Sequence, residues 1–404
     1  MSDINIFGGN ALRGEILPSG SKNASLPIIF STVAIHGISY LSCVPDIGDT
    51  RVAVEIIESF GAKVKRVGDA LVIDTRNLSY LPPKRELTSK LRASSYLIGA
   101  CLCRFGIFHL SEFGGCNFCN RPIDMHLAAA AALGAESSGG VLSAKRLSGT
   151  KIVFEKQSVG ATINAIIMAL AADGGTELIG AAKEPHVRAL VEFLTSAGAD
   201  IEQTASGYTV RKSNLHGGRA RIIPDMIEAG TYLLLAPLTE GEITVKNSRE
   251  LELDSFFEVL DSAGVCISIS GNDVTARGVP NKPITVITAP HPGYPTDLQP
   301  QMAPLMAKYF GGEIYERVWQ SRVSYLESLS AFGLKYSTVS DSIKITSSSL
   351  CSAVTCASDL RGGAAAVMCA LAVEGESKIK NAELILRGYS DFRSKLLRLG
   401  AKIY

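Results

Sequence analysis

The chain has 404 residues, which exceeds one ordinary domain and predicts two domains of about 200 residues each. Its 40 basic and 39 acidic side chains leave a formal net charge of +1, so no overall electrostatic field is available to hold a polyanion. No run of lysine and arginine resembles a nucleic-acid-binding arm, so we expect no nucleic-acid partner.

Two features bear on the compartment in which the protein works. The segment from Asn23 to Val44 carries no formal charge, but Pro27, His36 and Gly37 interrupt it. This pattern predicts a buried helix, a turn and a strand rather than a membrane span. The nine cysteines are an odd number in a large chain without a secretory leader. We therefore expect a cytoplasmic protein with no structural disulfide and no membrane contact.

A glycine that ends a helix recurs six times at roughly even intervals. In most cases a small or branched residue and then an alternating strand follow it, as in Phe60-Gly61-Ala62-Lys63-Val64. Glycine is the usual residue at the left-handed end of a helix, and a hairpin is predicted after most of these positions. The six positions are Gly61, Gly134, Gly198, Gly264, Gly333 and Gly400.

Each repeat also opens with a long apolar helix that stops at another glycine. The predicted segments are Lys22 to Gly37, Leu91 to Gly106, Val159 to Gly174, Met226 to Gly241, Asp297 to Gly311 and Leu360 to Gly375. Because they are apolar on nearly every face, we expect them inside the domains. The repeat is then strand, buried helix, strand, outer helix and hairpin, and six copies divide naturally into two domains of three.

Polar residues gather at the predicted helix starts. Lys22, Arg92, Ser158, Asp297 and Arg361 stand near the starts of buried helices, and Arg121, Glu184, Arg322 and Arg387 at the starts of outer helices. Helix N-termini expose N–H groups and favour phosphate or carboxylate, and desolvated arginines add stronger contacts. Two alike domains that faced each other by these ends would line a cleft suited to a small, anion-rich substrate.

The segment from Glu112 to Asp124 places a thiol on a loop freed by two glycines, Gly114-Gly115-Cys116, shortly before Arg121. A thiol beside cationic groups is the setting in which cysteine acidity shifts, so Cys116 could donate a proton or react with an electrophile. The alternative is a small core cysteine. Cys116 and Cys119 also have the spacing of a metal or redox dithiol, but no second pair at zinc spacing accompanies them.

Several motifs stand in order along the chain, from about residue 5 to the C-terminus. They are Ser19-Gly20-Ser21-Lys22-Asn23-Ala24, Leu91-Arg92-Ala93-Ser94, Gly114-Gly115-Cys116 with Arg121-Pro122-Ile123-Asp124-Met125-His126, Thr288 to Asp297, Ser358-Asp359-Leu360-Arg361 and Arg387-Gly388-Tyr389. In order and spacing this set resembles the UDP-N-acetylglucosamine 1-carboxyvinyltransferases, a family of enolpyruvyl transferases.

The resemblance implies a fold of two inside-out α/β barrel domains, each of three repeated units with buried helices and outer sheets and helices. It places the first domain at residues 1–21 with 224–404, the second at 22–223 with the Cys116 loop, and the active site in the cleft between them. The implied reaction passes the enolpyruvyl group of phosphoenolpyruvate to the 3′-hydroxyl of UDP-N-acetylglucosamine and releases phosphate. This is the first committed step of peptidoglycan precursor synthesis, and it implies no metal and no organic cofactor.

The resemblance also assigns roles to residues. Phosphoenolpyruvate would be held by Lys22, Asn23, Arg92, Arg121, Arg361 and Arg387. UDP-N-acetylglucosamine would be contacted by Asn23, Arg92, Arg121, Ser158, Val159, Gly160, Asp297 and Trp319. Lys22, Cys116 and Asp297 would be catalytic, with Asp297 as the base at the 3′-hydroxyl and Cys116 as the loop acid that fosfomycin alkylates.

The sequence departs from the family pattern at a few positions. Phe118-Cys119 replaces the common Ile-Gly in the loop, Met226 follows Asp225 where arginine is frequent, and Gln320-Ser321 precede Arg322 where an acidic residue and asparagine are usual. These changes affect local contacts rather than the reaction. Two alternatives remain, namely a shikimate-pathway enolpyruvyl transferase of the same fold and a non-catalytic paralogue that binds the sugar nucleotide.

Overall fold

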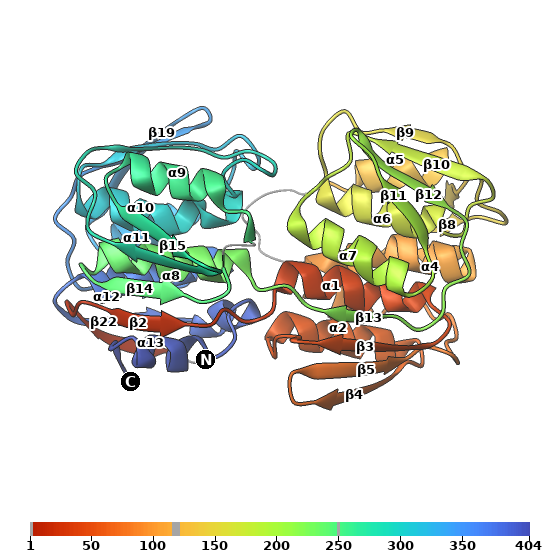
Figure 1. Cartoon of the computed structure of the whole chain (residues 1–404), viewed down its shortest axis with the longest axis horizontal. Coiled ribbons are helices and arrows are strands. Elements are labelled where there is room, and N and C mark those ends of the chain that lie inside the picture. Colours follow the sequence, from red (N-terminus) through yellow and green to blue (C-terminus); the bar gives the residue numbers. More distant parts are fainter. Residues whose placement is uncertain (1–2, 115–121, 249–250) are drawn as a thin grey trace. The chain divides into compact units, whose positions relative to one another are not determined.

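A computed structural model describes residues 3–114, 122–248 and 251–404. The chain forms two compact units (Figure 1). Within the described residues, unit 1 contains 3–19 and 224–404, and unit 2 contains 20–114 and 122–223. The chain therefore passes between the units at residues 19–20 and again at 223–224.

Unit 2 surrounds three buried helical segments with three sheets. The buried segments are α1 (Lys22–Ser31) with η1 (Thr32–Ala34), η2 (Arg92–Tyr96) with α4 (Leu97–Phe105), and α6 (Val159–Ala169); α4 packs against both α1 and α6. The remaining helices are α2 (Gly48–Ser59), α3 (Arg85–Thr88), α5 (Asp124–Ala132) and α7 (Pro185–Ser196).

The sheets of unit 2 have the orders β13-β3-β5-β4, β11-β12-β10-β9 and β6-β8-β7. Their strands are β3 (Ile38–Ser42), β4 (Lys63–Val67), β5 (Ala70–Asp74), β6 (Ile107–His109), β7 (Glu136–Ser138), β8 (Val141–Ser143), β9 (Lys151–Val153), β10 (Gly175–Ile179), β11 (Asp200–Gln203), β12 (Gly207–Arg211) and β13 (Arg219–Arg221).

Unit 1 repeats this plan. Its buried helices are α8 (Met226–Leu238), α10 (Gln299–Lys308) preceded by η4 (Thr296–Leu298), and α12 (Leu360–Ala372), and each packs against the other two. Around them lie α9 (Asp254–Ser262), α11 (Tyr325–Ser330), η5 (Ala382–Arg387) and α13 (Phe392–Arg398). Figure 1 shows α8 and α10 enclosed by sheets and outer helices.

The sheets of unit 1 have the orders β15-β16-β14-β2, β17-β18-β20-β19 and β21-β22-β1-β23. Their strands are β1 (Ile4–Gly8), β2 (Arg13–Ile16), β14 (Glu242–Val245), β15 (Cys266–Ser270), β16 (Asp273–Arg277), β17 (Ile284–Ile287), β18 (Gly312–Tyr315), β19 (Lys335–Val339), β20 (Ser342–Thr346), β21 (Val354–Cys356), β22 (Gly375–Lys380) and β23 (Lys402–Ile403).

The sixfold repeat predicted from the glycines is confirmed. Each of the six glycines follows the end of an outer helix, and each has a positive φ, from +85° at Gly333 to +100° at Gly198. The buried helices are shielded on nearly all sides because they meet other helices or the inner faces of sheets. In α6, for example, every residue from Ala161 to Ala169 is buried.

The sixth repeat differs from the other five, because its hairpin is completed by a strand from the other end of the chain. The C-terminal strand β23 pairs with β1, in the register Ile6 to Ile403, and β1 also pairs with β22. The last repeat of unit 1 is thus built from both ends of the chain, a pairing that was not predicted from the sequence. In the described part of the chain, no helix is long and apolar enough to cross a membrane.

Candidate active site

Lys22 lies in the first turn of α1, where the Ser21 hydroxyl caps the helix by accepting a hydrogen bond of 3.3 Å from the N–H of Ala24. Its Nζ lies 2.5 Å from an Asp49 carboxylate oxygen, and the side chains of Lys22 and Asp49 are only 15% and 5% exposed. Asn23 follows in the same turn and is partly buried. The start of α1 therefore presents an ammonium group whose position is set by a buried carboxylate.

The start of α6 carries the residues predicted to contact the sugar nucleotide. Ser158 caps the helix by accepting a hydrogen bond of 3.3 Å from the N–H of Ala161, and Val159 and Gly160 form the first turn. All three are partly exposed. A Cβ added at Gly160 would lie 2.8 Å from the imidazole Nε2 of His126, so this position has no room for a side chain.

His126 is buried and fixed by Asn164. The Asn164 amide nitrogen lies 2.7 Å from His126 Nδ1, while the amide oxygen accepts a hydrogen bond of 2.6 Å from the N–H of Gly99. Because the amide nitrogen donates, Nδ1 accepts and the ring is neutral. Burial, together with the smaller effect of the nearby charge of Arg92, lowers the pKa of His126 to about 4. Asn164 has no local sequence signature and was not predicted as part of the site.

Arg92 begins η2, and its Nη2 donates a hydrogen bond of 3.2 Å to the carbonyl oxygen of Pro122. The contact ties this arginine to the residue just after the predicted reactive loop. Cys116 and Arg121, two of the predicted site residues, lie outside the described residues.

In unit 1 the predicted base, Asp297, lies between two arginines. Asp297 belongs to η4, which leads into the buried helix α10. One carboxylate oxygen lies 2.8 Å from Arg322 Nη2 and the other 3.3 Å from Arg361 Nη2. Both arginine side chains are almost fully buried, whereas that of Asp297 is 27% exposed. The carboxylate is thus held by buried cations and still reaches solvent.

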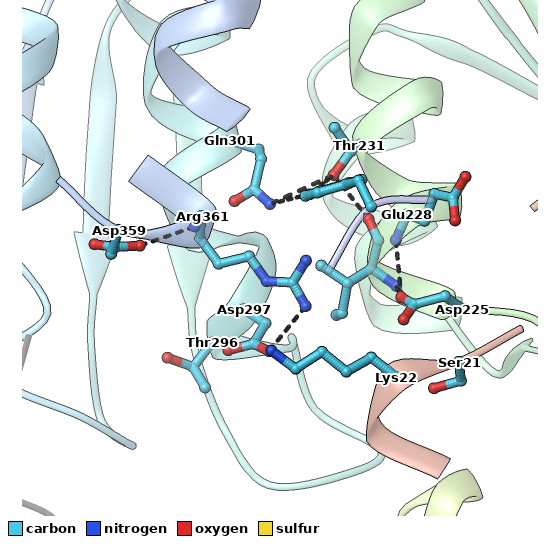
Figure 2. A network of polar contacts seen from close by, with 12 residues as sticks. Ser21, Lys22, Asp225, Glu228, Thr231, Thr296, Asp297, Gln301, Asp359 and Arg361 are labelled. Carbon is cyan, nitrogen blue, oxygen red and sulfur yellow. Dashed lines mark hydrogen bonds and ion pairs between the residues drawn. The ribbon is translucent and has the colours of Figure 1, made fainter. Parts of the chain in front are cut away.

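Arg361 lies in the first turn of α12, where Asp359 caps the helix by accepting hydrogen bonds from the N–H groups of Arg361 and Gly362, at 2.8 and 3.0 Å. Its guanidinium lies over the Tyr389 ring, 5.4 Å from the ring centre. Figure 2 shows the side chain directed toward Asp297. Among the residues that the structure describes, the buried Nη1 has no hydrogen-bond partner. Such a donor is costly to leave unpaired, and a ligand carboxylate or phosphate would satisfy it.

A polar network supports Tyr389 from within the helical core. Its hydroxyl lies 2.8 Å from the Thr231 hydroxyl and accepts a hydrogen bond of 3.2 Å from the Gln301 amide nitrogen. Figure 2 shows Thr231 and Gln301 directed toward each other. Burial raises the pKa of Tyr389. The network fixes the ring against which Arg361 stacks.

Arg387 and Trp319 are both partly exposed residues of unit 1. Arg387 is the last residue of η5 and is partly exposed. Trp319 lies in the loop after β18, partly exposed, and its backbone N–H donates a hydrogen bond of 2.8 Å to the buried carboxylate of Glu316. Within the part of the chain that the structure describes, no cluster of three or more His, Cys, Asp or Glu could hold a metal ion.

Each unit therefore gathers part of the predicted site. Unit 2 brings the starts of α1 and α6 to partly exposed positions, and unit 1 joins Asp297 to Arg361. Sequence reasoning missed Asp49 and Glu316, which bear no motif. It grouped Arg322 with the other outer-helix arginines but gave it no role, although its contact with Asp297 is the shorter of the two arginine contacts.

Comparison with known proteins identifies the class. Residues 6–396 match the family model described as EPSP synthase (3-phosphoshikimate 1-carboxyvinyltransferase). The chain belongs to this family of enolpyruvyl transferases, and the family and fold predicted from the sequence are confirmed.

Two relatives that match over the full length share one enzyme name. The chain is 39% identical over 414 residues to UDP-N-acetylglucosamine 1-carboxyvinyltransferase of Streptococcus pneumoniae serotype 2, across 100% of this chain and 99% of that protein. It is 38% identical over 412 residues to the protein of the same name from Halothermothrix orenii, with the same coverage.

Solved structures agree on the fold. The enolpyruvyl transferase NikO from Streptomyces tendae is similar with a TM-score of 0.89 and 26% identity, across 100% of this chain and 98% of that chain. An EPSP synthase from Acinetobacter baumannii gives a TM-score of 0.74 at 16% identity, across all of both chains, and this likeness concerns the fold alone.

Proposed function

We propose that the protein transfers the enolpyruvyl group of phosphoenolpyruvate to the 3′-hydroxyl of UDP-N-acetylglucosamine and releases phosphate. The observation that carries this proposal is the full-length similarity to proteins named for that reaction, at 39% identity. The two substrates are small anions, which suits helix starts that carry lysine and arginine. The role that this reaction implies is the first committed step of peptidoglycan precursor synthesis. From the cysteine content we further infer a cytoplasmic location, and from the balanced charge and the interrupted apolar segment we infer no nucleic-acid or membrane partner.

In this proposal the substrates occupy a cleft between two barrel domains, residues 1–21 with 224–404 and residues 22–223. Phosphoenolpyruvate is held by Lys22, Asn23, Arg92, Arg121, Arg361 and Arg387. Nη1 of Arg361 has no partner within the described part of the chain. This supports the assignment, because a buried guanidinium donor in that state favours an anionic ligand. UDP-N-acetylglucosamine meets Asn23, Arg92, Arg121, Ser158, Val159, Gly160, Asp297 and Trp319.

The chemistry requires an acid and a base on opposite sides of one carbon. Protonation of C3 of phosphoenolpyruvate, which is an enol phosphate, leaves a cationic C2, which the sugar oxygen attacks as its proton passes to a base. The C2–O bond to phosphate then breaks, phosphate leaves with the bonding electrons, and one of the C3 protons is lost, which forms the enol ether of the product. We assign the base role to Asp297 and the acid role to Cys116, and each contributes about 10² to 10⁴-fold.

The surroundings of Asp297 support its assignment. Its carboxylate is oriented by Arg322 and Arg361, yet it keeps 27% of its side-chain surface exposed, so a hydroxyl group can reach it. Lys22 and the arginines hold the phosphate and carboxylate of the tetrahedral intermediate, where charge is concentrated.

The acceptor distinguishes this function from its nearest rival, because the matching family model is described as a 3-phosphoshikimate 1-carboxyvinyltransferase. The test measures phosphate release by the purified chain from phosphoenolpyruvate with either UDP-N-acetylglucosamine or shikimate 3-phosphate. We expect release with the sugar nucleotide alone. Release with shikimate 3-phosphate instead would make the chain a shikimate-pathway enzyme, and binding of the sugar nucleotide without release would make it a non-catalytic paralogue.

A further inference from the structure

Glu316 is a buried carboxylate, 1% exposed, that directly follows β18. Its Oε1 accepts three hydrogen bonds, from the Thr288 hydroxyl at 2.8 Å and from the N–H groups of Val318 at 2.9 Å and Trp319 at 2.8 Å. Its Oε2 accepts one, from the Thr296 hydroxyl at 2.9 Å. The four donors that bond to it directly are thus two hydroxyl groups and two backbone N–H groups.

The two carboxylate oxygens of Glu316 are hydrogen-bonded to two different parts of the proposed site. Oε1 fixes the loop that carries Trp319, and Thr288 strengthens this branch because its hydroxyl accepts a hydrogen bond of 2.9 Å from the N–H of Arg317. Thr288, which directly follows β17, and Glu316, which directly follows β18, thus both bond to the backbone of the turn that carries Trp319.

Oε2 is connected to Asp297 through two groups, the Thr296 hydroxyl and the Arg322 guanidinium. The Thr296 hydroxyl donates to Glu316 and accepts a hydrogen bond of 3.1 Å from Arg322 Nη1, which also donates to the Thr296 carbonyl oxygen at 2.5 Å. The other nitrogen of that guanidinium, Nη2, lies 2.8 Å from Asp297. Figure 2 shows Thr296 and Asp297 as neighbours on one turn. The carboxylate therefore orients the arginine that orients the proposed base.

We propose that Glu316 is a positioning residue that sets both Asp297 and the Trp319 loop from a single buried carboxylate. This inference rests on the proposed function, because it takes Asp297 as the base and Trp319 as a contact of UDP-N-acetylglucosamine. Glu316 is buried and is not among the residues proposed to contact either substrate. Its two oxygens make its effects on turnover and on binding of the sugar nucleotide separable.

Two substitutions cut the branch to Asp297. In Glu316→Gln the amide oxygen can still accept the three bonds on the loop side, but the amide nitrogen then faces Thr296, whose hydroxyl proton loses its acceptor. Thr296→Val removes the hydroxyl outright, and Thr296→Ser keeps it. Glu316→Ala cuts both branches.

The experiment measures kcat and KM with UDP-N-acetylglucosamine and phosphoenolpyruvate, and binding of UDP-N-acetylglucosamine by calorimetry. We expect kcat to fall about tenfold or more in Glu316→Gln and Thr296→Val, since small displacements of a catalytic group have effects of this size. Affinity for the sugar nucleotide should fall by a clearly smaller factor than kcat in both, because the Trp319 loop stays in place and Asp297 is only one of the proposed contacts. Thr296→Ser should restore kcat. Glu316→Ala should lose both turnover and affinity for the sugar nucleotide.

Glu313→Gln is the matched control, because Glu313 lies in the same strand and bonds to the Tyr315 hydroxyl at 2.5 Å, away from this network. This variant should have the wild-type kcat, KM and affinity for UDP-N-acetylglucosamine. Wild-type kcat in both Glu316→Gln and Thr296→Val would overturn the inference, as would an equal loss of binding and turnover in every variant, including Thr296→Ser. If wild-type protein itself does not turn over UDP-N-acetylglucosamine, the proposed function fails and the inference falls with it.

Discussion

Lys22 Nζ and an Asp49 carboxylate oxygen lie 2.5 Å apart, and the two side chains come from the first turns of two adjacent helices, α1 and α2. The pair is largely buried from solvent, with side-chain exposures of 15% for Lys22 and 5% for Asp49. A carboxylate in such surroundings fixes the lysine position much more firmly than a surface partner would. We interpret Asp49 as the residue that holds Lys22 ready for phosphoenolpyruvate.

Replacing Asp49 by asparagine should therefore lower kcat/KM for phosphoenolpyruvate by about tenfold or more, because the ammonium group loses its fixed direction. Steady-state kinetics at several phosphoenolpyruvate concentrations would measure this. Asp46→Asn is the control, since Asp46 pairs with Arg51 at 2.8 Å on the surface beside the same helix, with side chains 49% and 64% exposed. Equal kinetics in the two variants would show that Asp49 does not position Lys22.

Asp297→Asn should reduce kcat by about two orders of magnitude, because a neutral amide cannot accept the sugar hydroxyl proton. The substitution keeps the shape and leaves the neighbouring arginines in place. Single-turnover measurements would separate the chemical step from product release. An unchanged kcat would remove Asp297 from the base role while leaving the fold assignment intact.

His126 should make unit 2 less stable in acid. Its pKa is lowered to about 4, below the ordinary value of 6.5, so the unfolded chain takes up a proton at higher pH than the folded chain. The stabilising contribution is complete above pH 6.5 and is lost as the pH falls toward 4. Between pH 7.5 and pH 5 the loss is about 2 kcal/mol.

Urea denaturation of wild type and His126→Gln at these two pH values would measure this contribution, since glutamine does not titrate. The variant should show the smaller decrease in the free energy of unfolding between pH 7.5 and pH 5. The same pH dependence in both proteins would contradict a neutral, hydrogen-bonded His126.

Fosfomycin should add covalently to Cys116, because the sequence places this thiol on a glycine-rich loop before an arginine. Intact-mass analysis after incubation should show one adduct on wild type and on Cys266→Ala, and none on Cys116→Ala. Cys266 is a suitable control because it is an exposed free cysteine. An adduct on Cys116→Ala equal to that on wild type would show that another residue reacts.

The sequence predicted the features that depend on local signals. The helix ends at Gly61 and Gly400 follow from left-handed glycine. The buried helices predicted to begin at Lys22 and Val159 also begin there in the structure. These signals depend on only a few neighbouring residues, so they can be recognised without knowing the tertiary fold.

Features that depend on distant partners were not predicted. Asp49 reaches Lys22, Asn164 reaches His126 and Glu316 reaches Thr288 only after the helices and strands have packed. Strand β1 likewise finds β23 from the opposite end of the chain. A buried polar residue within an apolar or mixed stretch was the available signal, but by itself it names no partner.

The proposed activity is the transfer of an enolpyruvyl group to a nucleotide sugar, and the most direct test is to isolate the product. Purified protein would be incubated with phosphoenolpyruvate and UDP-N-acetylglucosamine, and the product analysed by mass spectrometry and NMR alongside released phosphate. We predict one enolpyruvyl ether at the 3′-oxygen of the sugar for each phosphate released. Unmodified UDP-N-acetylglucosamine after prolonged incubation, or a linkage at another oxygen, would contradict the account.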